Sequence, residues 1–294
     1  MTGRARGSAP IDRVRLVDDL RTLGLGPGDD VLVHSSLRGL GHVEGGASTV
    51  VDALLDAVGP DGTVLFPTIT ATAEHGPAHP PRVVLAETPG WTGAIPEAAR
   101  VRPDAVRSVH PTHSVVALGT RARELTDGHA TSLTPCDAAS PYGKLADRGG
   151  RVLLLGGVTH SSSTSLHGVE ERARVPHHLQ ESPTDGIVVL PDGTEVVVRG
   201  RLHLWGWDRD FERVAEPLRA ADMQRCGRVG AGDATLVEAR GYVDVLVPLL
   251  RTDPTYLLAE HERDRARSLR HGRSPQGPHV DPSTSEVRIG VRTR

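Results

Sequence analysis

Two kinds of apolar stretch alternate at the start of the chain. Residues 11–23 and 50–58 carry apolar side chains at intervals of three and four, which predicts amphipathic helices. Residues 31–33 and 64–66 are short apolar runs near Gly and Pro breakers, a pattern typical of buried strands. The order of strand, helix and strand predicts a right-handed βαβ crossover and therefore two parallel strands.

The middle of the chain predicts more strands and one long loop. The apolar runs at 114–118 and 151–155 resemble the first two strands in length and composition. Residues 70–92 are rich in Pro, His and Gly, and they predict a long loop between these elements.

The pattern changes after residue 185. Residues 187–190 and 195–198 are apolar and flank Asp192-Gly193, a dipeptide typical of tight hairpin turns. We therefore expect an antiparallel hairpin that adds to the sheet.

The ends of the chain differ from its middle. Residues 1–10 predict a loose leader, and the Arg-, Ser- and Pro-rich residues 261–294 predict a helix end followed by a flexible tail. One folded domain is therefore expected at residues 11–260.

Composition narrows the class of protein. The 294 residues include 37% hydrophobic but only 3% aromatic side chains, and the net charge is −3, which argues against a nucleic-acid partner. The two cysteines cannot build a disulfide framework. No apolar run has the length of a membrane span, and the N-terminus lacks the apolar core of a signal peptide. These features predict a cytoplasmic protein without a membrane partner.

The first candidate site follows the apolar run at 151–155. Residues 161–165 are all Ser or Thr, and they lead into a predicted helix with His167 and Glu170 on one face. A carboxylate at this spacing can hold the imidazole in one tautomer while its other nitrogen accepts a proton. The pair is therefore a candidate general base; the alternative is a histidine that only packs in the core or lies on the helix surface.

Histidines also cluster before the strand at 114–118. His110 and His113 lie three residues apart, and His129, Cys136 and Asp137 follow. A zinc site needs three or four such ligands, but this spacing matches no known zinc pattern. The alternative is that these side chains form hydrogen bonds within a loop.

Two further segments offer weaker signals. His34-Ser35-Ser36 ends the first predicted strand and is followed by glycines, so its backbone could contact phosphate or simply form a turn. Residues 205–212 combine two Trp with three carboxylates, which suits a polyamine or aminosugar but equally suits the start of a helix.

In order along the chain, these motifs resemble those of the aminoglycoside 3-N-acetyltransferase family over roughly residues 15–250. The resemblance rests on His34-Ser35-Ser36-Leu37, Gly45-Gly46, residues 61–68, His110-Pro111 with Ser114, Ser140-Pro141, residues 152–156, Thr164-Ser165-Leu166-His167 with Glu170, and Gly227-Arg228-Val229-Gly230. It implies a single α/β/α-type domain of the family's own topology, with a central mixed sheet.

The resemblance also implies an activity. Acetyl-coenzyme A would serve as co-substrate, and its acetyl group would pass directly to an amine of an aminoglycoside-type substrate. His167 would act as the base and Glu170 would orient it. No metal is expected, and the acceptor would be a small cationic molecule.

Other roles implied by the resemblance concern binding. Ser35, Ser36, Leu37, His110, Thr112, Ser114 and Thr164 would line the coenzyme A side, and Asp208 and Glu171 would contact the cationic substrate. Many family members have Asn where this chain has Ser163, and the 70–92 segment also differs from theirs. The acceptor could therefore be a different amine, in a biosynthetic pathway.

Two rival functions stay open at this stage. A zinc-dependent hydrolase would draw ligands from His110, His113, His129, Cys136 or His167, and chelation would abolish its activity. A non-catalytic ligand-binding protein would bind coenzyme A without turnover. The sequence leaves open whether the protein is a monomer or a homodimer.

Overall fold

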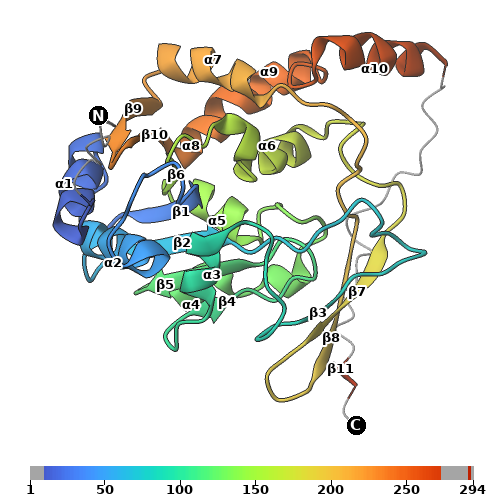
Figure 1. Cartoon of the computed structure of the whole chain (residues 1–294). Coiled ribbons are helices and arrows are strands. Elements are labelled where there is room, and N and C mark those ends of the chain that lie inside the picture. The colour runs from blue at the N-terminus through green and yellow to red at the C-terminus, as the bar shows by residue number, and fades with distance from the viewer. Residues whose placement is uncertain (1–9, 273–290, 293–294) are drawn as a thin grey trace, which may run out of the picture.

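A seven-stranded mixed sheet forms the centre of the computed structural model, which describes residues 10–272 and 291–292 (Figure 1). In spatial order the strands are β4 (Val106–Arg107), β5 (Val115–Gly119), β2 (Thr63–Pro67), β1 (Asp30–Ser35), β6 (Arg151–Leu155), β10 (Gly232–Glu238) and β9 (Gln224–Val229). The strands β2, β1 and β6 are parallel, and the outer strands pair in antiparallel fashion. The expected parallel strand–helix–strand unit is confirmed, because α2 (Gly46–Val58) connects the neighbouring strands β1 and β2.

Helices cover both faces of this sheet. The first face packs against α1 (Arg13–Leu23), α2 and α3 (Ala94–Arg100). The second face packs against α4 (Ala122–Thr126), α5 (Pro141–Asp147), α6 (Ser165–Ala173), α7 (Ala215–Ala220), α8 (Ala239–Gly241), the π-helix η4 (Tyr242–Leu246) and α9 (Val247–Thr252). Short 3₁₀ turns occur at η1 (His129–Thr131), η2 (His160–Ser162) and η3 (Phe211–Val214). This is the α/β/α arrangement that the family resemblance implied.

Side chains of β1 alternate between the two faces, as a strand requires. Val31 and Val33 belong to the core under α1 and α2, whereas Leu32 belongs to the core under α6. The same alternation assigns His34 to the α6 face and Ser35 to the opposite face.

The predicted hairpin forms, but it belongs to a second, smaller sheet. β7 (Thr184–Val189) and β8 (Glu195–Gly200) are antiparallel, and they combine with β3 (Arg82–Val84) and β11 (Val291–Arg292) in the order β11-β8-β7-β3. The expectation that the hairpin extends the central sheet was therefore wrong, as Figure 1 also makes clear. The strand β3, inside the segment predicted as a loop, supplies the partner edge for β7.

The helix α10 (Glu260–Gly272) continues past residue 260, where we expected the folded domain to end. It contacts the body through Arg263, which pairs with Asp253 at 2.7 Å. Residues 1–9, 273–290 and 293–294 lie outside the described part of the chain, so most of the predicted tail and leader does too. Among the described helices, none has both the length and the apolar composition needed to cross a membrane.

The loops after β1 and β6 contact each other through their backbones. A Cβ atom added to Gly39 would lie 1.8 Å from the carbonyl oxygen of Gly156, and one added to Gly156 would lie 2.4 Å from the carbonyl oxygen of Ser36. Only glycine permits this approach. It brings the His34–Ser36 segment next to the loop that leads into α6, at the edge where parallel strands end and α/β proteins bind ligands.

Candidate active site

His167 lies in the first turn of α6. The chain leaves β6 at Leu155, passes through η2 and enters α6 after Thr164. Thr164 occupies the N-cap position. Its side chain forms no capping hydrogen bond, but its carbonyl accepts from the backbone N–H of His167 at 3.0 Å. The helix nonetheless sets His167 and Glu170 on one face, as their spacing predicts.

The imidazole of His167 is held by Glu170. Nδ1 of His167 lies 2.9 Å from Oε2 of Glu170, and the Glu170 side chain is only 1% exposed. With the carboxylate accepting the Nδ1–H, Nε2 carries the free lone pair. The side chain of His167 is 24% exposed.

A buried guanidinium compensates the charge of Glu170. Nε of Arg209 donates to Oε1 of Glu170 at 3.0 Å, and Nδ1 of His178 lies 3.1 Å from Oε2. Burial alone raises the pKa of this carboxyl, but His178, Arg209 and His167 together hold it well below its usual range. Glu170 therefore stays ionised.

The titration of the two nearby histidines differs in direction. Burial lowers the pKa of His167, and the hydrogen bond to Glu170 offsets this only in part. Burial also lowers the pKa of His178, but contact with Glu170 and Glu171 outweighs it and raises the pKa. His167 is therefore the neutral ring at neutral pH, which is the form that can accept a proton.

Glu171 is also buried, and its carboxylate is occupied by protein groups. Its oxygens accept from Thr134 Oγ1 at 2.6 Å and from the backbone N–H of Cys136 at 3.0 Å, and one lies 2.8 Å from Nε2 of His203. The side chain is 4% exposed. The structure thus places Glu171 behind the site, whereas the family resemblance implied a direct contact with substrate.

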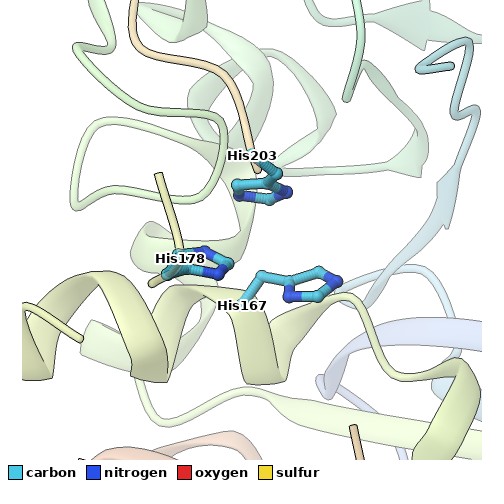
Figure 2. A group of neighbouring side chains, drawn as sticks. All are labelled: His167, His178 and His203. Atoms are coloured by element: carbon cyan, nitrogen blue, oxygen red, sulfur yellow. The ribbon is translucent and has the colours of Figure 1, made fainter. Parts of the chain in front are cut away.

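Histidine rings form a continuous row beside α6. His167 contacts His178 and His203, with ring centroids 5.2 and 4.7 Å apart, as Figure 2 shows. The row continues from His203 to His113 at 4.5 Å and on to the loop before β5. Its members are His129, His110, His113, His203, His178 and His167.

The loop before β5 is closed by its own hydrogen bonds. Nδ1 of His110 accepts from the backbone N–H groups of Thr112 at 3.2 Å and His113 at 3.0 Å. Burial, with the neighbouring rings, lowers the pKa of His110 and His113 well below the usual value. His129 is held between Ser108 Oγ and the carbonyl of Pro135, which agrees with the loop-bonding alternative for these histidines.

Ser114 is fully engaged in this region. Its hydroxyl donates to the carbonyl of Thr68 at 3.1 Å and accepts from Nε of Arg107 at 3.0 Å. His110, Thr112 and Ser114 directly precede β5. They lie at the edge of the sheet where β2 ends, because Pro67 of β2 pairs with Val115 of β5. The helix α6, which carries His167, begins near the same edge. Ser114, however, points its hydroxyl into the protein.

The end of β1 contains unpaired polar atoms. Nε2 of His34 and Oγ of Ser35 are buried and have no hydrogen-bond partner among the described residues. Burial and the nearby His167 lower the pKa of His34 to about 3. Ser36 accepts from the backbone N–H of Gly39 at 3.2 Å and shapes the turn, while Leu37 packs against the core under α1 and α2.

Asp208 lies outside the buried group. Its side chain is 75% exposed and pairs with Nε2 of His261 on α10 at 3.0 Å. The next residue, Arg209, points inward and donates to Glu170. The Trp-rich segment therefore runs from the surface of the protein to the buried carboxylate. Nearby, Arg265 of α10 lies over the ring of Trp207 at 4.4 Å.

Comparison with known proteins gives the family. Residues 32–251 match the family described as aminoglycoside 3-N-acetyltransferase. The chain belongs to the aminoglycoside 3-N-acetyltransferase family. It is 36% identical to aminoglycoside N(3)-acetyltransferase VII of Streptomyces paromomycinus, over 81% of this chain and 91% of the relative.

Solved structures of this family have the same fold. AAC-IIIb in a binary complex with CoASH matches 83% of this chain and 97% of its own, with a TM-score of 0.69 and 28% identity. A histidine-to-alanine mutant of AAC(3)-IVa in complex with a gentamicin matches 90% of this chain and 99% of its own, with a TM-score of 0.73 and 27% identity. The family resemblance and the fold class predicted from the sequence are confirmed.

Three residues of the site escaped the sequence analysis: His178, His203 and Arg209. Arg209 and His203 lie 39 and 32 residues beyond the glutamates they contact, a separation that no local spacing reveals. The pair His177-His178 just beyond the predicted helix was the one local signal. Arg209 stands among three carboxylates in residues 205–212, and the composition of that segment gives no sign that its one arginine pairs with Glu170.

Proposed function

We propose that this member of the aminoglycoside 3-N-acetyltransferase family transfers the acetyl group of acetyl-coenzyme A to an amine of an aminoglycoside, with His167 as general base. The observation that carries the proposal is the 2.9 Å contact between Nδ1 of His167 and Glu170, on a ring that is partly exposed. Acetyl-coenzyme A supplies the acetyl group as a reactive thioester.

The base acts on the amine. An ammonium has no lone pair for attack, so Nε2 of His167 must take a proton before or during formation of the new C–N bond. The C–S bond of the thioester then breaks, and the imidazolium can return its proton to the departing sulfur. The second proton that the amine nitrogen loses in becoming an amide passes to solvent. Glu170 stabilises the imidazolium that forms in between, since its carboxylate is ionised and hydrogen bonded to Nδ1.

Direct transfer agrees with the state of Cys136. Its thiol is buried, and burial with the nearby carboxylates raises its pKa well above the ordinary value. A thiol of this kind is a poor nucleophile. We therefore assign no acetyl-enzyme intermediate to it.

The end of β1 and the residues just after it suit a ligand rich in hydrogen-bonding groups. The unpaired Nε2 of His34 lies on the face of the sheet that α6 covers, and the unpaired Oγ of Ser35 lies on the opposite face at the same edge. AAC-IIIb, of the same fold, has been solved with CoASH. Ser35, Ser36 and Leu37 are therefore proposed to line the coenzyme A side, and Thr164 and the His110–Ser114 loop to lie near the thioester.

Exposed carboxylates suit the cationic acceptor. Asp208 is 75% exposed, next to the residue that contacts Glu170, and it can attract an ammonium-bearing sugar. AAC(3)-IVa, of the same fold, has been solved with a gentamicin and with apramycin. Glu171 would act from behind, by fixing His203.

The test is release of free thiol from acetyl-coenzyme A over a panel of aminoglycosides and simple amines. For the preferred amine, we expect His167→Ala to lower kcat at least about a hundredfold while coenzyme A binding stays close to that of the unmodified protein. The exposed His42 is the matched control, and His42→Ala should leave kcat unchanged.

Three results would contradict the proposal. Near-normal turnover by the His167 variant would show that His167 is not the general base. Coenzyme A binding without thiol release on any amine would favour a binding protein. Preference for a simple amine over every aminoglycoside would favour a biosynthetic acyltransferase on the same scaffold.

A further inference from the structure

The three rings in Figure 2 converge from separate segments. His167 comes from α6, His178 from the turn after α6, and His203 from the chain after β8. One ring nitrogen from each lies within 4.8 Å of the others. Histidine is the commonest nitrogen ligand for transition metals in proteins.

A carboxylate holds one nitrogen of every ring. Glu170 lies 2.9 Å from Nδ1 of His167 and 3.1 Å from Nδ1 of His178, and Glu171 lies 2.8 Å from Nε2 of His203. Nη2 of Arg209 also lies 3.1 Å from Nδ1 of His178. Histidines that bind metal usually donate one N–H to a carboxylate, which orients the ring and makes its other nitrogen more basic.

His178 supplies an independent indication. Its side chain is fully buried, and its Nε2 has no hydrogen-bond partner among the described residues, although Oε1 of Glu171 lies 3.9 Å away. A buried polar atom without a partner costs free energy, and a ligand in the space between the rings would remove that cost.

The local charge also favours a cation. Two buried carboxylates, Glu170 and Glu171, lie behind the rings, and among the described residues Arg209 is the one guanidinium that contacts either of them. With all three rings neutral, the group carries an excess of negative charge. A divalent cation reverses that excess. Because Glu170 and Glu171 raise the pKa of His178, a metal that binds this ring must displace any proton it carries.

The backbone keeps two of the rings in place. Leu179 and His203 form an isolated antiparallel bridge. Around it, the N–H of Leu204 donates to the carbonyl of His178 at 2.8 Å, and the N–H of Gln180 donates to the carbonyl of Leu202 at 2.9 Å. The segments that carry His178 and His203 are thus joined by main-chain bonds, and the two rings lie 4.4 Å apart at an angle of 43°. This gives the rigidity that a metal site needs.

We propose that His167, His178 and His203 form a binding site for a late first-row divalent metal, best suited to Zn²⁺. Three imidazoles and one open position make a tetrahedral zinc site of the kind known in enzymes. Zinc–nitrogen bonds of about 2.0–2.1 Å put ligand nitrogens about 3.4 Å apart, so the rings must turn inward from their present spacing as the metal binds.

Such a metal would inhibit acetyl transfer. His167 cannot accept a proton through a nitrogen that is bound to metal, so the bound and the catalytic forms exclude each other. This second part rests on the proposed function, whereas metal binding itself does not.

Metal binding is measured first, without reference to activity. Chelator-treated full-length protein without a histidine tag is titrated at pH 7.5 with Co²⁺, followed by visible absorption, and with Zn²⁺, followed by calorimetry. We expect one equivalent of each metal and the intense Co²⁺ absorption typical of tetrahedral sites. His178→Gln and His203→Gln should weaken binding at least about a hundredfold.

The matched control is His261→Gln. His261 forms a second group of metal-ligand spacing with the exposed Asp208 and the buried Glu262, so this variant tests an adventitious site near the surface. It should bind Co²⁺ like the unmodified protein. A rise in Tm with Zn²⁺ that is absent in His203→Gln would show that the variant folds but lacks the site.

Two outcomes overturn metal binding: no stoichiometric uptake by the unmodified protein, or uptake that His261→Gln abolishes and His203→Gln leaves intact. The inhibitory part is tested by thiol release with and without one equivalent of Zn²⁺. If the protein binds one equivalent of Zn²⁺ and its turnover is unchanged, only the inhibitory part is overturned. If the protein binds metal but releases no thiol with any amine, only the proposed function is overturned.

Discussion

Glu170 and Glu171 are neighbours in sequence but face different partners. Successive residues of a helix point in directions about 100° apart, so Glu170 meets His167 and Arg209 while Glu171 meets Cys136 and His203. The pair shows how adjacent carboxylates on one helix turn acquire separate tasks. Glu170 sets the charge around the base, and Glu171 holds His203 and the backbone of Cys136 in place.

For single residues, the first prediction concerns how kcat depends on pH. The fall of kcat at low pH, here called the acid limb, should reflect protonation of His167. The base must be neutral, and burial lowers its pKa, so kcat should fall with decreasing pH only below 6.5. Glu170 raises the pKa of His167 and Arg209 lowers it. Glu170→Gln should therefore shift the limb to lower pH and Arg209→Gln to higher pH, both with reduced kcat, as measured by pH-dependent thiol release.

Arg172 is the control for that pair of variants. It lies on α6 but pairs with Asp147, away from the base. Arg172→Gln should leave the acid limb in place. If Glu170→Gln and Arg209→Gln shift the acid limb in the same direction, the group whose protonation lowers kcat is not His167.

The elements that position the site are β1, β6 and α6 with their connecting loops. The periodicities of residues 31–33 and 151–155 predicted both strands, and the structure begins the first one residue earlier and ends it two residues later. The spacing of His167 and Glu170 predicted their contact, because i and i+3 are neighbours on any helix. The separate small sheet was not predicted, since β3 is only three residues long and is defined by its pairing with β7.

The contact between the β1 and β6 loops gives an element-scale prediction. A Cβ on Gly39 would meet the carbonyl oxygen of Gly156 at 1.8 Å, so the two loops must separate. We expect Gly39→Ala to lower the free energy of unfolding by about 1–3 kcal/mol. Urea denaturation at pH 7.5 measures this.

Gly26 is the matched control, because a Cβ there has open space within 4 Å and its φ is not in the left-handed region. Gly26→Ala should leave stability unchanged or raise it slightly. Equal effects of the two substitutions would mean that the loop contact contributes nothing.

At the scale of the whole molecule, the buried histidines link folding to pH. Burial is the largest influence lowering the pKa of most of them. It lowers the pKa to about 3 for His34 and about 4 for His129, and well below 6.5 for His110, His113 and His203. The unfolded chain binds protons at these rings below pH 6.5 and the folded protein does not. Stability therefore decreases as pH falls.

We expect the free energy of unfolding to fall from about pH 6.5 downward, with each such histidine contributing at most about 1.4 kcal/mol per pH unit. Glu170, whose pKa is lowered, adds to the loss below about pH 4.5. His178 acts in the opposite sense, because its raised pKa means stability that is present at low pH and lost as pH rises through that pKa. Urea unfolding between pH 8 and 5 measures the net slope.

His34→Gln tests this attribution, since it should remove one histidine's share of the slope, while the exposed His42→Gln should remove none. A stability that stays constant between pH 7 and 5 would contradict the account. So would an equal change of slope in both variants.

The sequence by itself determined the features that depend on neighbours within a few residues: the strands around Val31–Val33 and Val152–Leu155, the helix with His167 and Glu170, and the ordered motifs of the family. Tertiary structure decided which distant side chains meet them. Arg209 neutralises Glu170, and His178 and His203 join His167, because loops far apart in sequence return to one edge of the sheet. Local periodicity carries no information about such contacts, since they follow from the path of the whole chain.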